Sequence, residues 1–171
     1  MDIRRRMLLS NEGGVIYYTS SDSKIVEPYK TNVFGANIIS NTYVDGKGVI
    51  TFDGDVTSIG DHAFYWSSNL TSITIPDSVI SIGSTALGSC NSLSSVTIGK
   101  SVTSIEIYAF YSCSKLTRVY CKATTPPALG SYVFNVNGRG RKIYVPAESV
   151  EAYKSATNWS EYASAIVGYN F

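Results

Sequence analysis

The feature that most constrains the fold of this chain is an internal repeat. Three consecutive units of 23 residues, which begin at Ile50, Ile73 and Val96, align without gaps. A fourth unit of 24 residues begins at Val119, and the start of a fifth begins at Ile143. One unit of this length cannot bury its apolar side chains alone, whereas a stack of such units buries them between neighbours. The repeat therefore predicts a short solenoid.

Matching apolar positions indicate what each unit buries. A branched aliphatic residue recurs in four units, and it is followed by a small and then a large apolar residue. We expect the small and large residues to lie on a short helical turn that packs into the core. The three columns are Ile59, Ile82, Ile105 and Leu129; Ala63, Ala86, Ala109 and Val133; and Phe64, Leu87, Phe110 and Phe134.

Each unit also predicts one strand. In the second unit, residues 72–75 alternate between polar and apolar, which is typical of a strand with one buried face. Pro76-Asp77-Ser78 then predicts a turn. Strands of successive units would lie about 4.8 Å apart in a parallel sheet. We therefore expect the first residues of the units to lie on adjacent parallel strands: Ile50, Ile73, Val96, Val119 and Ile143.

The units resemble the BspA-like leucine-rich repeat family of bacterial surface proteins. The resemblance rests on Leu70–Val79, Ser81-Ile82-Gly83 and Ala109–Cys113, and it covers residues 48–145. It implies an α/β repeat fold, a short leucine-rich-repeat solenoid with a parallel sheet. Members of the family are typically adhesins or cell-surface binding modules that engage host matrix proteins. The resemblance thus implies a non-catalytic module that binds a protein or glycan at the cell surface.

The flanking segments are expected to cover the two ends of the solenoid, because open ends expose apolar side chains and unpaired strand edges. On the N-terminal side we expect a strand over 36–43, joined to the first unit by Asp45-Gly46, and a hairpin between 15–18 and 24–26. On the C-terminal side we expect capping helices over 146–157 and 159–166. The expected division is 1–14 basic anchor or tail, 15–47 β cap, 48–145 solenoid and 146–171 helical cap.

Composition argues against catalysis. The chain has one histidine, His62, which disfavours histidine-based zinc sites and a histidine-dependent triad. A net charge of +1 supplies no field that would favour nucleic acid or cations. We expect no enzyme activity, no cofactor, no metal and no membrane span. After the basic start, only Met7–Leu9 is apolar, which is shorter than the roughly 7–15 residues of a secretory signal.

Two further patterns have structural interpretations. Cys90 and Cys113 fall in one column of adjacent units, at a spacing compatible with a disulfide. Column residues project in parallel, however, so we expect buried free thiols, as also for Cys121. Asp53-Gly54-Asp55 resembles the start of a calcium loop, but its twelfth position is Phe64 rather than Glu. We expect a turn there.

The outward positions of the predicted strands change character along the sheet. The early units place small residues there, such as Ser72 and Thr74. The last two units instead place two cations beside two tyrosines: Arg118, Tyr120, Lys142 and Tyr144. Tyrosine and arginine are enriched in binding hot spots, although long charged side chains also protect sheet edges. As a binding site, this cluster would suit an acidic or polar partner.

A basic segment precedes the predicted cap. Arg4, Arg5 and Arg6, followed by Met7 and Leu8, form either a free basic arm or a docking element that anchors the chain in an assembly. The first ten residues also resemble the starts of phage-encoded fibre and virion proteins of gut bacteria. This resemblance implies an alternative function, in which the protein is a virion or fibre component docked through the segment.

Overall fold

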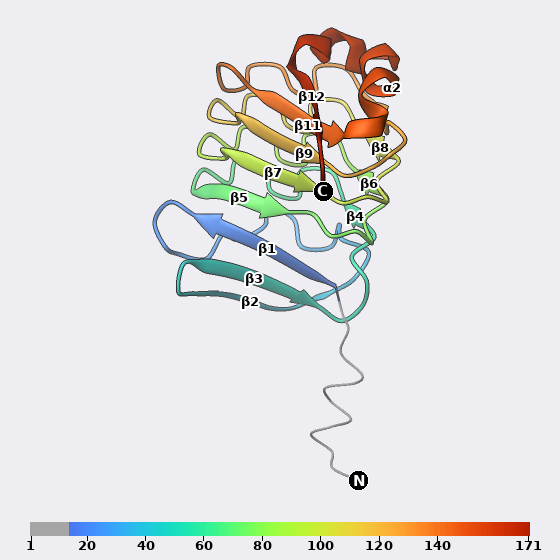
Figure 1. The fold of residues 1–171 in the computed structure, drawn as a ribbon. Helices are drawn as coiled ribbons and strands as arrows, with labels where there is room; N and C mark the ends of the chain where they lie inside the picture. Colours follow the sequence, from blue (N-terminus) through green and yellow to red (C-terminus); the bar gives the residue numbers. More distant parts are fainter. Residues whose placement is uncertain (1–13) are drawn as a thin grey trace.

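The computed structural model describes residues 14–171, which form two sheets joined by turns. The large sheet contains β1 (Val15–Ser20), β2 (Ile38–Val44), β3 (Lys47–Phe52), β5 (Leu70–Thr74), β7 (Ser95–Ile98), β9 (Arg118–Cys121), β11 (Lys142–Pro146) and β12 (Ile166–Tyr169). The small sheet contains β4 (Ser58–Ile59), β6 (Ser81–Ile82), β8 (Ser104–Ile105) and β10 (Ala128–Leu129). The large sheet has the order β12-β11-β9-β7-β5-β1-β3-β2, and its strands lie one above another in Figure 1.

Four of the five units contribute adjacent parallel strands, as the alternation predicts. Ile73 pairs with Val96, Val96 with Val119, and Val119 with Ile143. All four side chains are buried. The small sheet repeats the same register, since Ile59, Ile82, Ile105 and Leu129 are cross-strand partners along it. One apolar core therefore fills the space between the sheets.

The prediction for the first unit is wrong. Ile50 lies on β3, and β1 separates β3 from β5, running antiparallel to both (Figure 1). Ile16 of β1 pairs with Ile50, and Tyr18 pairs with Ile73. Ile16 and Tyr18 are buried, with exposed fractions of 0% and 2%. The segment 15–20 thus adds two buried side chains to the core and pairs with a strand on each side, β3 and β5.

The hairpin expected between 15–18 and 24–26 does not form. Residues 24–26 contain no strand, and the Val26 N–H donates to the Tyr18 hydroxyl at 3.2 Å. The second N-terminal pairing does occur, as β2 runs antiparallel to β3. The turn between them uses Asp45 and Gly46 with φ values of 49° and 79°, the left-handed geometry that a two-residue hairpin requires.

The helical turn expected around Ala86 and Leu87 is also wrong, because this stretch is a chain of turns. Thr85 and Ser89 have left-handed φ values of 54° and 59°. The N–H groups of Thr85, Leu87 and Ser89 donate to carbonyls of the next unit at 3.2, 2.8 and 2.8 Å. A helix would direct these donors into itself, whereas here alternate donors join neighbouring units.

The C-terminal segment is only partly helical. It contains the 3-10 helix η1 (Ala147–Ser149), α2 (Val150–Ser155) and the 3-10 helix η2 (Trp159–Ala165), close to the ranges expected. The helix predicted through Ile166 is wrong at its end, because β12 begins there and pairs in parallel with β11. β-Branched Ile166 and Val167 favour a strand, and the open edge of β11 supplies its partner.

The buried interior is apolar and contains all three thiols. Phe34, Phe52, Phe64, Phe110 and Phe134 are fully buried. The 3 cysteines of the chain are free and buried. The Cys90 and Cys113 thiols donate to carbonyls of Phe64 and Leu87, each at 3.1 Å. Over residues 14–171, the helices are too short or too polar to cross a membrane.

Candidate binding face

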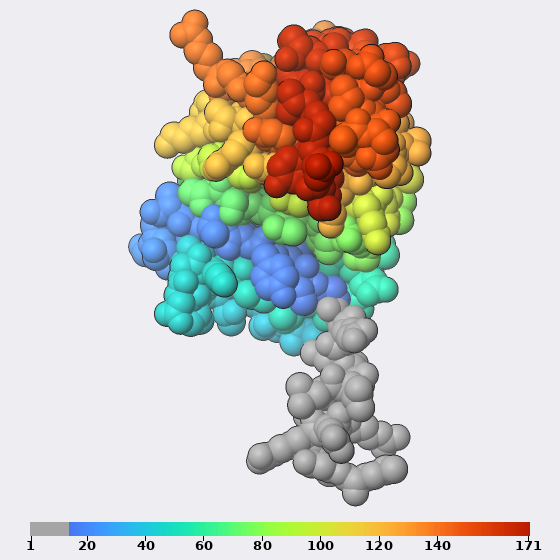
Figure 2. All heavy atoms as spheres, viewed as in Figure 1, coloured from blue at the N-terminus to red at the C-terminus, as the bar shows by residue number. Residues whose placement is uncertain are grey.

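The outward face of the large sheet carries two rows of side chains, which run across the strands. The first row begins with hydroxyls and ends with cations: Thr19, Ser72, Ser95, Arg118 and Lys142. The second row has aromatic residues towards its ends and threonines between them: Val49, Tyr17, Thr74, Thr97, Tyr120, Tyr144 and Val167. We call this surface the sheet face; Figure 2 shows it in space-filling form, with β1 in blue and β12 in dark red.

The structure brings the four predicted residues together. Lys142 is the cross-strand partner of Arg118, and Tyr144 is the partner of Tyr120. The two phenol rings stack with centroids 4.7 Å apart and planes inclined by 13°. Both cations are exposed, whereas the tyrosines are half-buried. The stack therefore offers a flat, partly desolvated surface beside two positive charges.

The two cations lie together without a compensating carboxylate. Like charges directly opposite each other on a sheet are destabilising. Within the described part of the chain, neither Arg118 nor Lys142 forms an ion pair, since the ion pairs join Lys122 to Asp77 and Lys154 to Glu151. This corner of the sheet face is therefore locally positive and suits a partner that brings negative charge.

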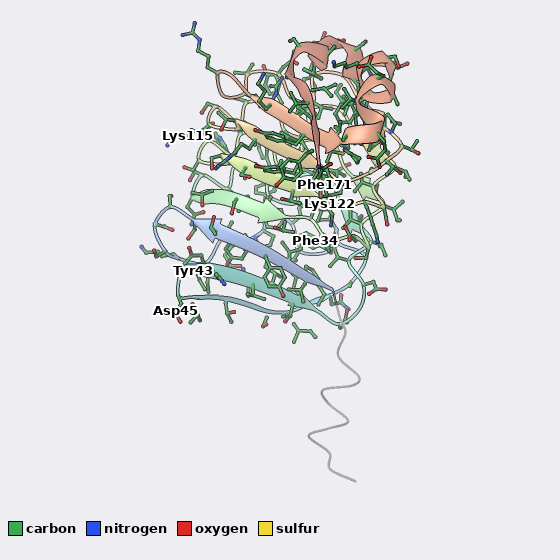
Figure 3. All side chains as sticks on the ribbon, viewed as in Figure 1. Phe34, Tyr43, Asp45, Lys115, Lys122 and Phe171 are labelled. Carbon is green, nitrogen blue, oxygen red and sulfur yellow. The ribbon has the colours of Figure 1, made fainter. Side chains whose placement is uncertain are left out.

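Sequence reasoning missed a third tyrosine at this corner. Tyr169 of β12 meets the rings of Tyr120 and Tyr144 edge-on, at centroid distances of 5.4 and 5.6 Å. The ring centroid of Phe171 lies 5.0 Å from that of Tyr169. Phe171 and Lys122, both labelled in Figure 3, line the same hollow of the surface. The available signal was the β-branched pair Ile166-Val167, of which Ile166 was expected to end a helix over 159–166.

The other end of the sheet face is also aromatic, contrary to our expectation of small residues there. Tyr17 is 55% exposed and lies on β1 beside Thr74. It borders a cavity of about 370 Å³ whose other walls include Thr19, Lys47 and Ser72. Sequence analysis predicts a strand over 15–18, but only as part of a hairpin, because no repeat period connects this segment to the units.

One carboxylate among the turns, that of Asp77, has a structural role. Asp77 accepts hydrogen bonds from the Lys100 N–H at 3.0 Å and from the Lys122 ammonium at 3.1 Å. These interactions, the backbone hydrogen bond first, hold the pKa of Asp77 below its ordinary value despite partial desolvation. The carboxylate is thus ionised, and it ties together the turns of three successive units.

The other chemically suggestive residues lie in turns. His62 has a left-handed φ of 60° and packs edge-on against Tyr65, 5.5 Å away. The Asp53 carboxylate accepts two hydrogen bonds from Asn37, both at 2.8 Å, which tie the bend after β3 to the segment before β2. Over residues 14–171, no cluster of three or more His, Cys, Asp or Glu side chains could hold a metal ion. The docking segment Arg4–Leu8 lies outside the described residues.

Comparison with known families agrees with the repeat. The family model described as "BspA type Leucine rich repeat region" matches residues 46–161 in six copies. This match extends beyond the units into η1, α2 and the start of η2. No curated protein matches the chain.

Proposed function

The chain belongs to the BspA-type leucine-rich repeat family, and from this we propose that it is a non-catalytic, adhesin-like module whose sheet face binds a protein or glycan partner at a cell surface. Repeats of this family are typically non-catalytic, and they are consistent with protein binding. We further propose that the units form a short solenoid of 23-residue period. Residues 15–47 and 146–171 would close its ends, and residues 1–14 would stand apart as a basic segment.

The observation that carries this proposal is the stacked pair Tyr120 and Tyr144 beside Arg118 and Lys142. Phenol rings supply flat contact area at a small entropic cost, and the paired cations attract an acidic or polar partner. Tyr169 supports both rings from the side. A partner would therefore meet a pre-arranged surface rather than side chains that must first be ordered.

The size of the sheet face indicates what kind of partner it suits. From β1 to β12 there are five strand spacings, or about 24 Å, and the strands are roughly 15 Å long. Such a face covers a few hundred Å², less than the roughly 800 Å² per partner of a standard protein interface. We therefore expect modest affinity for a single site, strengthened when several copies engage one surface.

A direct test uses surface plasmon resonance of the full chain over immobilised extracellular-matrix proteins. Thr97 lies between the two aromatic ends of the face, so Thr97→Trp should obstruct it and abolish binding. Glu151→Trp, at an exposed position of α2, adds the same bulk elsewhere and should leave binding unchanged. Equal binding by wild type and Thr97→Trp, or no binding to any matrix protein, would contradict the proposal.

The alternative is a virion or fibre component docked through its N-terminal segment. Its support is the sequence Arg4-Arg5-Arg6-Met7-Leu8, which combines charge with apolar residues. Deletion of residues 1–12 would then abolish assembly while the sheet-face variants assemble normally. Matrix binding that survives the deletion and is lost in Thr97→Trp would favour the adhesin.

A further inference from the structure

A second surface of the molecule is lined by aromatic side chains. It lies on the third side of each unit, between the short strand of the small sheet and the next strand of the large sheet. Two columns of residues run along it from unit to unit, and neither belongs to the sheet face. The columns are His62, Thr85, Tyr108 and Tyr132, and Tyr65, Gly88, Tyr111 and Asn135.

The units are held in register on this side by backbone hydrogen bonds. The N–H groups of His62, Thr85 and Tyr108 each donate to the following unit, at 3.1, 3.2 and 3.2 Å. Where aromatic rings follow one another in a column, they stack: Tyr108 and Tyr132 have centroids 5.5 Å apart and planes inclined by 11°. The column geometry therefore arranges rings into a ladder.

The ladder has a gap in the second unit. Both columns lose their ring there, because Thr85 and Gly88 stand where the first unit has His62 and Tyr65. The gap is a groove of about 320 Å³, lined by Tyr65, Thr85, Gly88, Ser89, Tyr108 and Tyr111. This volume is at the small end of the roughly 300–1,000 Å³ typical of ligand pockets.

Gly88 keeps the groove open. A Cβ atom at this position would lie 2.5 Å from Cγ2 of Thr85 and 3.5 Å from Cδ2 of Tyr65. The flanking units are two strand spacings apart, or about 9.6 Å. A ring inserted between two others needs a carbon–carbon distance of about 3.5–4.0 Å on each side. The gap therefore admits a single ring from a ligand.

The chemistry of the lining selects the class of ligand. None of the six lining side chains is charged, so the groove offers no ion pair to an acidic or basic peptide. Aromatic rings line the walls, with Tyr108 and Tyr111 edge to face at a centroid distance of 5.2 Å, and Thr85 and Ser89 add hydroxyl groups. Tyr111 is 37% exposed, so the groove is accessible to a ligand. A sugar ring matches this combination, because its C–H faces pack on aromatic rings while its hydroxyls exchange hydrogen bonds.

We propose that the groove between Tyr65, Tyr108 and Tyr111 is a binding site for one ring of a neutral saccharide. The bound ring occupies the position of the missing ladder ring. Each neighbouring tyrosine contributes a contact comparable to the aromatic stacking already present along the column. The site is independent of the sheet face, and its failure would leave the matrix-binding proposal untouched.

Saturation-transfer NMR and calorimetry of the full chain would test the site, with cellotriose, maltotriose and triacetylchitotriose as probes. Thr85→Tyr should abolish binding, because Tyr108 and Tyr132 adopt the same left-handed backbone in the same column, with φ of 62° and 59°. Its ring would complete the ladder without disturbing the fold, which a thermal melt would verify. Tyr111→Ala should weaken binding about tenfold or more, and Tyr111→Phe, which keeps the ring, far less.

Ile80→Ala is the matched control and should bind all three saccharides as wild type does, because Ile80 is 47% exposed, lies between β5 and β6 and belongs to neither surface. Saccharide binding that persists unchanged in Thr85→Tyr would overturn the proposal, as would the absence of binding to every probe at millimolar concentration. A proline-rich peptide is the competing occupant, since such peptides also dock on aromatic grooves. Binding of that peptide, lost in Thr85→Tyr, together with no saccharide binding, would assign the groove to peptides instead.

Discussion

Tyr120 and Tyr144 stack across neighbouring strands because they are cross-strand partners in a parallel sheet, with ring centroids 4.7 Å apart. This distance matches the strand spacing of about 4.8 Å, so equivalent residues of successive units meet ring to ring. The same rule positions Phe110 on Phe134 and Tyr108 on Tyr132, each at 5.5 Å. The repeat therefore converts a sequence separation of one unit into direct aromatic contact.

The Tyr120–Tyr144 stack should be measurable as a coupling energy. We expect Tyr120→Ala and Tyr144→Ala to be non-additive by about 0.5–1.5 kcal/mol in the free energy of unfolding, the usual value of an aromatic pair. Urea unfolding of the wild type, both single variants and the double variant measures this coupling energy. Additivity to within about 0.3 kcal/mol would mean that the rings do not interact in solution.

The core column predicts a large difference between a buried and an exposed residue. Phe110→Ala removes a fully buried ring that stacks on Phe134, and it should cost about 3–5 kcal/mol. Thr74→Ala changes an exposed strand position and should cost less than about 1 kcal/mol. Thermal melts of both variants compare the two sites, and similar losses would show that the register is wrong.

The left-handed turns predict a stabilising substitution. Val136 has a φ of 56°, a conformation that is strained for a β-branched residue and tolerated by asparagine. Val136→Asn should therefore raise the free energy of unfolding by about 1 kcal/mol. Val44→Asn is the matched control, because Val44 is similarly exposed, 64% against 60%, but lies in β2. That control should gain nothing, and a loss of stability in Val136→Asn would contradict the strain argument.

Burial of Cys121 predicts a loss of stability at alkaline pH. Removal from water raises the pKa of this thiol from 9.0 to about 11, although the Tyr153 hydroxyl partly offsets the effect. The folded chain keeps the proton between these values, whereas the unfolded chain releases it. The protonated thiol therefore contributes fully to the free energy of unfolding below about pH 9, and this contribution is lost as the pH rises through about 11.

Cys121→Ala removes this titration and should flatten the pH dependence. The free energy of unfolding of the wild type should fall more steeply above pH 9, by up to about 1.4 kcal/mol per pH unit. Urea unfolding of both proteins at pH 7, 9 and 10 measures the two slopes. Parallel slopes would show that the thiol does not titrate as described.

The repeat made the parallel sheet predictable, because one period relates Ile73, Val96 and Val119 to strands that must stack. The fourth unit, one residue longer, relates Tyr120 to Tyr144, so their contact across neighbouring strands was predictable too. The predictions that failed concern features that the period does not encode: the strand partner of Ile50, the turns around Ala86 and Leu87, and the two flanking segments. β1 comes from a segment that precedes the units. It pairs with β3 and β5, whose residues Ile50 and Ile73 are distant from β1 in sequence. Such non-local antiparallel pairing has no local signal.

The C-terminal error has a different cause. Residues 159–166 are compatible with helical cover, and Trp159 and Tyr162 are indeed buried. What decides the outcome for Ile166 is the open edge of β11, a tertiary feature that overrides local preference. The unexpected place of β1 in the sheet and the missed strand β12 account for the two missed aromatic residues of the sheet face, Tyr17 and Tyr169.

The dissociation rate of Tyr120→Ala from a matrix protein bound by the wild type tests the central claim most directly. A buried aromatic anchor governs dissociation, so we predict an off-rate about 30-fold faster, whereas Ser95→Ala on the same sensor surface should leave it unchanged. The Lys142→Ala variant should mainly lower the salt dependence of binding. Equal off-rates for Tyr120→Ala, Ser95→Ala and the wild type would contradict the account and place binding outside the sheet face.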